Sequence, residues 1–208
     1  YESSPRKELT FNVESALSIF DANKFSDLGD NNNNGVAVLA TLGLNQYNFN
    51  LFGLKLNAVE LKLKEKLVNK LYLPLERYNP VEFYREYDIQ DTNKLTEDLH
   101  EISLRVIPSR NLDIKGSFGQ LLRGDVFNSL RTVGEFALRN DSVSFPELSY
   151  RIEITKSNYS VTQTASSWIK QSALAGYKKF FGGQSYDNPN FELRLEFKQE
   201  DRNNLFEG

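Results

Sequence analysis

The chain has 208 residues, of which 39% are apolar and 25% are charged. Its formal net charge of −3 argues against nucleic acid as a partner, because nucleic-acid-binding proteins usually carry a basic patch. No apolar run approaches the ~18 residues that a membrane-spanning helix needs, so no such helix is predicted. Methionine is absent, even at position 1, which leads us to expect a piece of a longer chain or a subunit of an assembly, and cysteine is absent as well.

The first third of the chain is predicted to contain strands and one short helix. Residues 9–13 alternate apolar and polar side chains, which predicts a half-buried strand. Residues 16–29 carry apolar side chains at helical spacing, with Gly29 as an end signal, and predict a short helix. Residues 36–63 have a strand-like alternation, but the apolar side chains change between odd-numbered and even-numbered positions along it. Such a shift of parity indicates a bulge or bend, for which Gly53 is well placed.

A polar segment before residue 36 has the spacing of a calcium loop. Asp30, Asn32, Asn34 and Gly35 match positions one, three, five and six of such a loop. Position twelve is Thr41, where a calcium loop has a glutamate that binds the ion through both oxygens. We therefore favour a hairpin turn at Asn34-Gly35, and calcium is the one cofactor hypothesis that the sequence offers.

The middle of the chain allows both helix and strand. Between residues 59 and 75, apolar side chains four residues apart would suit a helix as well as a strand. Residues 76–91 are expected to form a loop with a short strand. Residues 95–102 are expected to add one or two helical turns.

The second half alternates more regularly. Strands are expected near residues 101–107, 111–118, 130–139, 148–155 and 191–198. Residues 166–181 are the best helix candidate, because apolar side chains recur there at helical spacing and a Gly-Gly pair follows. A strand interpretation of the same residues stays open, because their odd-numbered positions are also apolar or small.

These patterns predict a mainly β fold with one or more antiparallel sheets. The arrangement is a sandwich or an open, barrel-like sheet, with one to three short helices. We treat residues 1–208 as a single β-rich domain and note a weak candidate boundary near residues 88–98.

No motif indicates catalysis. His100 is the only histidine and cysteine is absent, which excludes a multi-histidine metal site and a cysteine nucleophile. Glu82, Glu86 and Asp88 lie among tyrosines and would suit glycoside hydrolysis if they met in a cleft. A solvated acidic segment is the favoured interpretation, so no catalytic residue and no enzymatic activity are predicted.

We therefore expect a non-enzymatic structural or binding module of a larger assembly at the cell envelope or outside the cell. Its partners would be proteins, and membrane association without a transmembrane helix is included. A virion or tail component is one alternative. Another is a lipid carrier, in which side chains such as Leu148, Tyr150, Ile152 and Ile154 would line a groove or barrel. A third is an outer-membrane barrel, although alternating runs of seven or eight residues fall short of the ~9–11 that a membrane strand needs.

Overall fold

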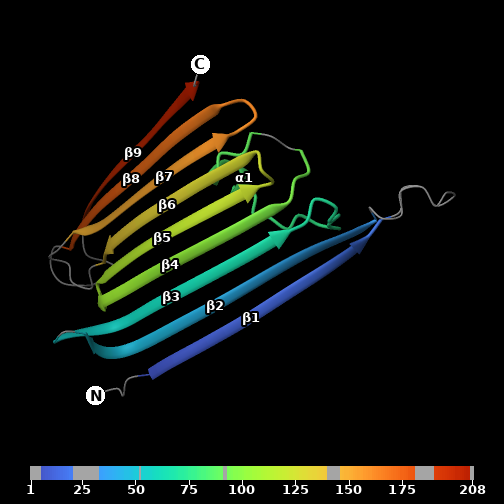
Figure 1. Ribbon diagram of the computed structural model, residues 1–208. Coiled ribbons are helices and arrows are strands. Elements are labelled where there is room, and N and C mark those ends of the chain that lie inside the picture. The colour runs from blue at the N-terminus through green and yellow to red at the C-terminus, as the bar shows by residue number, and fades with distance from the viewer. Residues whose placement is uncertain are drawn as a thin grey trace.

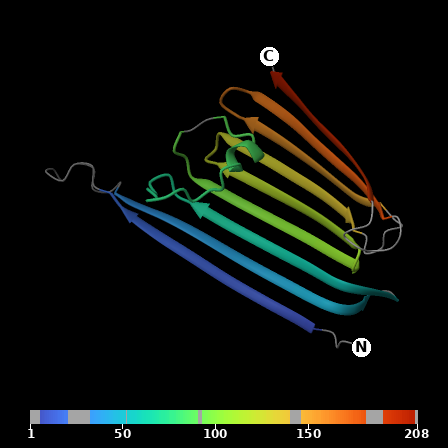
Figure 2. The ribbon, with the colours of Figure 1, turned by 180° about the vertical axis from the view of Figure 1, so that it is seen from behind.

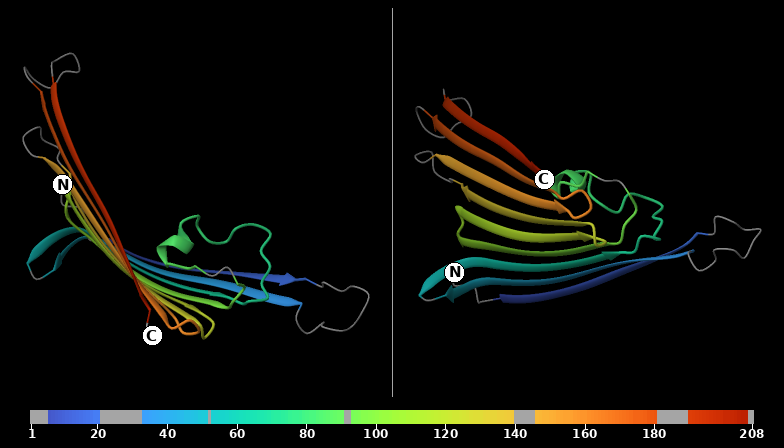
Figure 3. Two further views of the ribbon diagram at one scale, coloured as in Figure 1. Left: turned by 90° about the horizontal axis from the view of Figure 1, so that it is seen from above. Right: turned by 45° about the horizontal axis from the view of Figure 1, so that its top comes forward.

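The described residues form a single open antiparallel sheet of nine strands, each paired with the strand that follows it in sequence (Figure 1). The computed structural model describes residues 6–20, 33–51, 53–90, 93–139, 146–180 and 190–206. The sheet is strongly twisted and curved (Figure 3). The strands are β1 (Arg6–Ile19), β2 (Asn34–Leu51), β3 (Leu54–Val68), β4 (Glu97–Ser109), β5 (Leu112–Arg123), β6 (Phe127–Leu138), β7 (Glu147–Tyr159), β8 (Thr164–Phe180) and β9 (Asn190–Phe206).

The strands are 12 to 18 residues long, so the predicted antiparallel β class is confirmed and the strands extend well beyond the predicted runs. Some of the extensions, such as residues 199–204 of β9, cover stretches where both parities are polar. Such stretches give no alternation signal in sequence, yet neighbouring strands continue their ladder of backbone hydrogen bonds through them.

The helix predicted at residues 166–181 is wrong, because these residues belong to β8, which pairs with β7 on one side and β9 on the other. The same apolar side chains satisfy a period of two and a period of 3.6. Two neighbouring strands in register then decide in favour of the strand, since local propensity is weaker than tertiary pairing.

Other helix predictions also give way to strands. The region at 59–75 is strand as far as Val68, and residues 97–102 open β4. In the helix predicted at 16–29, β1 continues to Ile19, and residues 21–32 lie outside the described part of the chain. The short helix among the described residues is α1 (Phe83–Glu86), within the stretch where a loop and a strand were expected.

Two glycine predictions have different outcomes. Gly53 adopts a φ of 85° in the turn between β2 and β3, so the parity shift there marks a tight turn. The hairpin turn predicted at Asn34-Gly35 is wrong, because these residues open β2 and pair with Ile19 and Ser18 of β1.

The two faces of the sheet carry different side chains. On β4, Leu99, Glu101 and Arg105 lie on one face, and Ile102 and Leu104 lie on the other, because successive strand residues alternate. We call the first face the inner face. It includes the residues of the other strands that pair directly, from strand to strand, with these residues of β4. The second is the outer face.

The connection between β3 and β4 crosses the inner face, on the side toward which the sheet curves (Figures 2 and 3). We call its residues 69–90, which include α1, the strap. The strap covers a small apolar core whose buried members come from α1 and its C-terminal end and from three strands: Phe83, Tyr87, Leu99, Leu121 and Phe127. The buried apolar cluster therefore lies between the strap and the inner face. Within the described residues, no helix is long and apolar enough to cross a bilayer.

Candidate functional site

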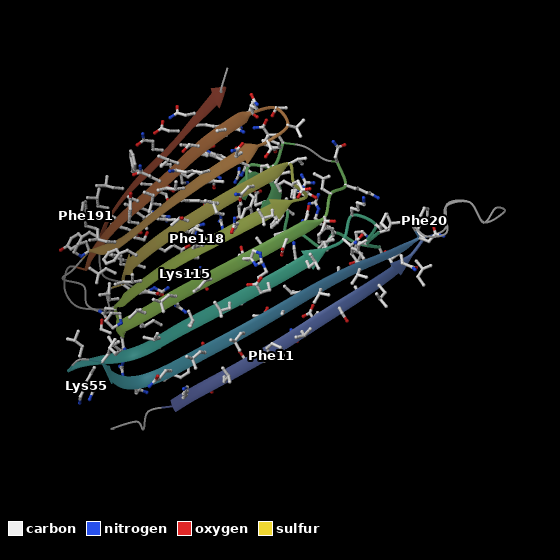
Figure 4. All side chains as sticks on the ribbon, viewed as in Figure 1. Phe11, Phe20, Lys55, Lys115, Phe118 and Phe191 are labelled. Carbon is white, nitrogen blue, oxygen red and sulfur yellow. The ribbon has the colours of Figure 1, made fainter. Side chains whose placement is uncertain are left out.

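In the part of the chain that the structure describes, the outer face is largely apolar and no segment covers it. Phe11, Phe118 and Phe191 come from β1, β5 and β9 (Figure 4), and expose 72%, 45% and 50% of their surface. Twenty large apolar side chains of this face are exposed: Leu9, Phe11, Val13, Leu17, Ile19, Val36, Leu42, Leu67, Ile102, Leu104, Ile114, Phe118, Leu130, Phe136, Leu148, Tyr150, Phe191, Leu193, Leu195 and Phe197. Together they expose roughly 1,000 Å² or more, beyond the few hundred Å² usual for a soluble monomer.

This apolar surface forms a band that runs obliquely across the strands. The apolar run on β2, residues 36–44, is centred on Ala40. If one moves from Ala40 to the residue facing it on the next strand, and repeats this over seven strand pairs, the residue reached on β9 is Asn203. The apolar run on β9, residues 191–197, is centred on Arg194, nine residues before Asn203. Across the sheet the band therefore shifts by nine residues, about 30 Å along the strands, over seven strand spacings, about 34 Å. The strands are thus tilted by about 40° from the direction perpendicular to the long axis of the band.

Polar side chains border the band at the end of the sheet where the strap attaches. Glu65, His100, Gln120, Asn128 and Lys156 lie there on the outer faces of β3 to β7. The outer face thus gains polar side chains toward this end of the sheet, although Leu67 of β3 and Leu122 of β5 lie beyond them.

The inner face carries a ladder of charges. Glu60, Arg105, Lys115, Glu135 and Arg151 are consecutive cross-strand partners from β3 to β7. Opposite charges at directly facing positions attract, and most neighbours in this row have opposite sign.

Arginines connect the acidic groups of this ladder. The Arg105 guanidinium donates to both oxygens of Asp113, with Nη2 2.6 Å from Oδ2, and its Nη1 lies 3.3 Å from Glu60 Oε2. Arg151 donates to Glu135, and its Nη2 lies 3.1 Å from Glu153 Oε2. Such bidentate and shared pairs fix planar guanidinium groups in place more firmly than single contacts do.

The strap is attached to the inner face by polar contacts around its core. The Tyr87 hydroxyl donates to Glu101 Oε1 at 2.7 Å, and Lys64 Nζ lies 2.7 Å from the other oxygen of the same carboxylate. Arg131 joins both sides, with Nη2 3.2 Å from Glu86 of the strap and Nε 2.8 Å from Glu153 of β7.

Asp88 ends the helical turn of the strap in the left-handed region, with a φ of 55°. The Ser157 hydroxyl donates to its Oδ2 at 2.7 Å, and Arg202 Nη2 lies 2.5 Å from its Oδ1. Aspartate tolerates positive φ better than most residues do, and here two strands hold its buried side chain. These contacts connect the strap to β7 and β9.

A fully buried ion pair lies beneath the start of the strap. Glu97 and Arg123 face each other on β4 and β5, with Nε 3.3 Å from Oε1 and 3% of each side chain exposed. Tyr78 and Asn79 of the strap donate to the other oxygen of Glu97, at 3.2 and 3.4 Å. The pair is thus hydrogen-bonded on several sides, as burial of charge requires.

The buried environment changes the acidity of two strap tyrosines. Burial raises the pKa of Tyr87 far above its usual value, and the neighbouring Glu101 carboxylate adds to the effect. Burial likewise raises the pKa of Tyr78, with Glu97 as a further cause. Both hydroxyl groups therefore keep their protons and act as donors.

Beside the strap, the inner face is hollowed into a polar trough of about 1030 Å³. Small polar side chains such as Thr41, Ser103 and Ser117 line it together with the charged ladder. Tyr87 is the one strap residue in its lining among the described residues. The trough is suited to water and hydrated solutes, because its walls offer charged and hydroxyl groups.

The candidate site residues from the sequence do not meet in this trough. Asn34 opens β2, and Asp30 and Asn32 lie outside the described residues, so the calcium prediction stays a prediction. Glu86 and Asp88 are held in the ion pairs described above, and Glu82 pairs with Arg85.

His100 lies on the outer face at the border of the band. Its ring contacts Glu65 through Nδ1 and lies 3.5 Å from Asp98 Oδ1 through Nε2. Two carboxylates and an imidazole within 4.8 Å could ligate a metal ion. The contacts of the ring with both acids already account for this arrangement.

The charged ladder was not predicted from the sequence. Its signal was present as charged residues of one parity within each strand, for example Lys62, Lys64 and Lys66 on β3. The partners across the sheet became evident only with the register.

Comparisons with protein-family models, with curated proteins and with solved structures give no match to this chain.

Proposed function

We propose that this chain is a structural module of the cell envelope, a curved β-wall embedded in a lipid bilayer. The outer face lies against hydrocarbon, and the inner face lines an aqueous lumen that the strap partly fills. One observation carries the proposal: among the described residues, large apolar side chains from eight of the nine strands are exposed on the outer face, while the opposite face is charged.

The free energy of hydration supports a lipid environment. Burying roughly 1,000 Å² of apolar surface is worth about 25 kcal/mol at the usual coefficient. A bilayer removes that surface from water without any further protein layer. A free sheet in water would leave it exposed, and such a patch promotes aggregation.

The dimensions of the band support the same environment. Membrane β-strands are tilted by ~35–45°, and their apolar band is ~25 Å tall. The oblique band of this sheet gives a tilt of about 40°, and nine residues on β2 at that tilt span roughly 22 Å. Strands of 12 or more residues meet the length that membrane strands need, although their apolar runs are shorter.

The arrangement disfavours a lipid carrier. A carrier would place apolar side chains on its concave side around the ligand. Here the concave side is the charged inner face, and residues such as Leu148 and Tyr150 lie on the outer face. The trough on that concave side is lined by seven basic and four acidic residues, which an acyl chain would have to desolvate.

The proposal requires partners at both edges. Backbone groups exposed to hydrocarbon must be hydrogen-bonded, and among the described strands β1 and β9 each pair on one side. Neighbouring strands of an assembly would satisfy these edges. Protein partners therefore follow from the membrane placement.

Depth-dependent fluorescence quenching tests the proposal. Trp168 is replaced by phenylalanine, and one new tryptophan is placed at Leu104 of the outer face or, as the matched control, at Ser103 of the inner face. In vesicles with bromine on the lipid acyl chains, we expect strong quenching for Leu104→Trp and weak quenching for Ser103→Trp. Equal quenching at the two positions, or recovery of the protein in solution without detergent, would overturn the proposal.

A further inference from the structure

We infer that the polar trough passes small hydrated anions. This inference rests on the proposed membrane placement, which gives the trough water on both sides. It adds to the proposed function the class of solute that passes, and it assigns the preference for anions over cations to named residues. Chloride and inorganic phosphate are examples of anions of the size meant here.

The lining of the trough is basic although the chain is acidic overall. Seven lysine or arginine residues and four aspartate or glutamate residues line it, an excess of three positive charges. The whole chain has a net charge of −3. The charge of the trough is therefore opposite to the charge of the protein as a whole.

Ion pairs account for all four acidic groups of the lining. Glu60 and Asp113 both pair with Arg105. Glu135 pairs with Lys115 and Arg151, and Glu101 pairs with Lys64. Each acidic charge thus has at least one basic partner within 4 Å.

Two basic residues of the lining are in excess. Among the described residues, neither Lys62 nor Arg139 has an ion-pair partner within 4 Å, and both side chains are exposed. Lys62 faces Ser103 across β3 and β4, whereas Arg139 follows β6. They lie at separate parts of the trough wall and supply positive charge in addition to that of the ion pairs.

The surroundings strengthen the effect of this charge. A water-filled channel with walls of low dielectric focuses the field of its lining charges and raises the local concentration of counter-ions. The strap is held by side-chain contacts to β3, β4, β6, β7 and β9, among others, so its Tyr87 forms a fixed side of the passage. The hydroxyl groups of Thr41, Ser103 and Ser117 can donate to a passing anion.

Bilayer conductance tests the inference. The intact protein is reconstituted, its insertion is established by the quenching assay above, and the reversal potential is measured in a KCl gradient. We expect chloride to be preferred over potassium, and Lys62→Gln with Arg139→Gln to lower the preference by roughly half, since the excess charge falls from three to one. The matched control is Arg110→Gln with Lys156→Gln, which removes the same charge from outside the trough and should leave the reversal potential unchanged.

The outcomes separate the inference from the proposed function. Insertion with a preference for potassium, with no conductance, or with equal effects of the two double variants overturns the anion passage and leaves the membrane placement intact. Failure of insertion overturns the membrane placement and the passage together.

Discussion

The outer and inner faces of the sheet are built from alternate residues of the same nine strands, yet they differ in what covers them. The apolar outer face has no protein layer over it among the described residues, and the charged inner face holds the strap and the buried apolar cluster. In a soluble half-buried sheet the apolar face would be the covered one. Alternation of apolar and polar residues along a strand therefore indicates that its two faces have chemically different surroundings. It does not show that the apolar face is turned toward the protein interior.

The inner face depends on paired charges for its structure. The comparison therefore predicts that changes of charge will have opposite consequences on the two faces. Adding charge should be harmful outside, and removing a buried partner should be harmful inside.

The largest effect is expected from the buried ion pair. Arg123→Leu leaves Glu97 charged and buried, which should lower the free energy of unfolding by about 3–5 kcal/mol. Arg105→Leu removes a half-exposed arginine from the same face and should cost less than about 1 kcal/mol. Urea unfolding in lipid or detergent measures the free energy of unfolding of both variants. Equal losses in the two would show that the burial of the Glu97–Arg123 pair does not determine its contribution to stability.

A charge on the outer face should have the next largest effect. Leu104→Arg near the middle of the apolar band should destabilise the membrane-inserted sheet by about 2–4 kcal/mol. Ser103→Arg, one residue earlier on the inner face, should be tolerated because the trough is polar. Unfolding from vesicles distinguishes them, and tolerance of arginine at both positions would contradict an apolar environment around Leu104.

The attachment of the strap is tested by two glycines of β5. A Cβ added at Gly119 would lie 2.3 Å from the Tyr87 hydroxyl, whereas at Gly116 it would meet nothing within 4 Å. Gly119→Ala should therefore displace Tyr87 and cost about 1–3 kcal/mol, and Gly116→Ala should be close to neutral. Protease cleavage within the strap is the measurement. Unchanged protection in Gly119→Ala would mean that Tyr87 is not fixed where the structure has it.

The smallest effect near neutral pH concerns tyrosine ionisation. Because burial raises the pKa of Tyr87, the folded protein holds this proton more tightly than the unfolded chain does. The resulting stability is complete below about pH 10, the unfolded value, and is lost as the pH rises further. Tyrosinate absorbance during alkaline titration should show two tyrosines with delayed ionisation, Tyr78 and Tyr87, and Tyr87→Phe should remove one of them. Ionisation of all tyrosines near pH 10 in the folded protein would contradict the burial.

The sequence was sufficient for the β class, because alternation such as that of residues 148–154 is unambiguous. It was insufficient for β8, where small side chains fit two periods equally well, and two flanking strands decide the outcome. The charged ladder could not be predicted, because Arg105 and Glu135 are neighbours of Lys115 only through the register of three strands. The faces could be separated by parity, but the position of the strap depends on contacts between residues as far apart as Asp88 and Arg202.

The odd number of strands restricts how the sheet can be closed. In a nine-strand meander, β1 and β9 run in the same direction. If these two edges met each other, or met the edges of an identical copy with the same orientation, the seam would be parallel. A fully antiparallel ring built on the nine described strands therefore needs an odd number of additional strands between β9 and β1, and that count can be checked in any larger assembly that contains this sheet.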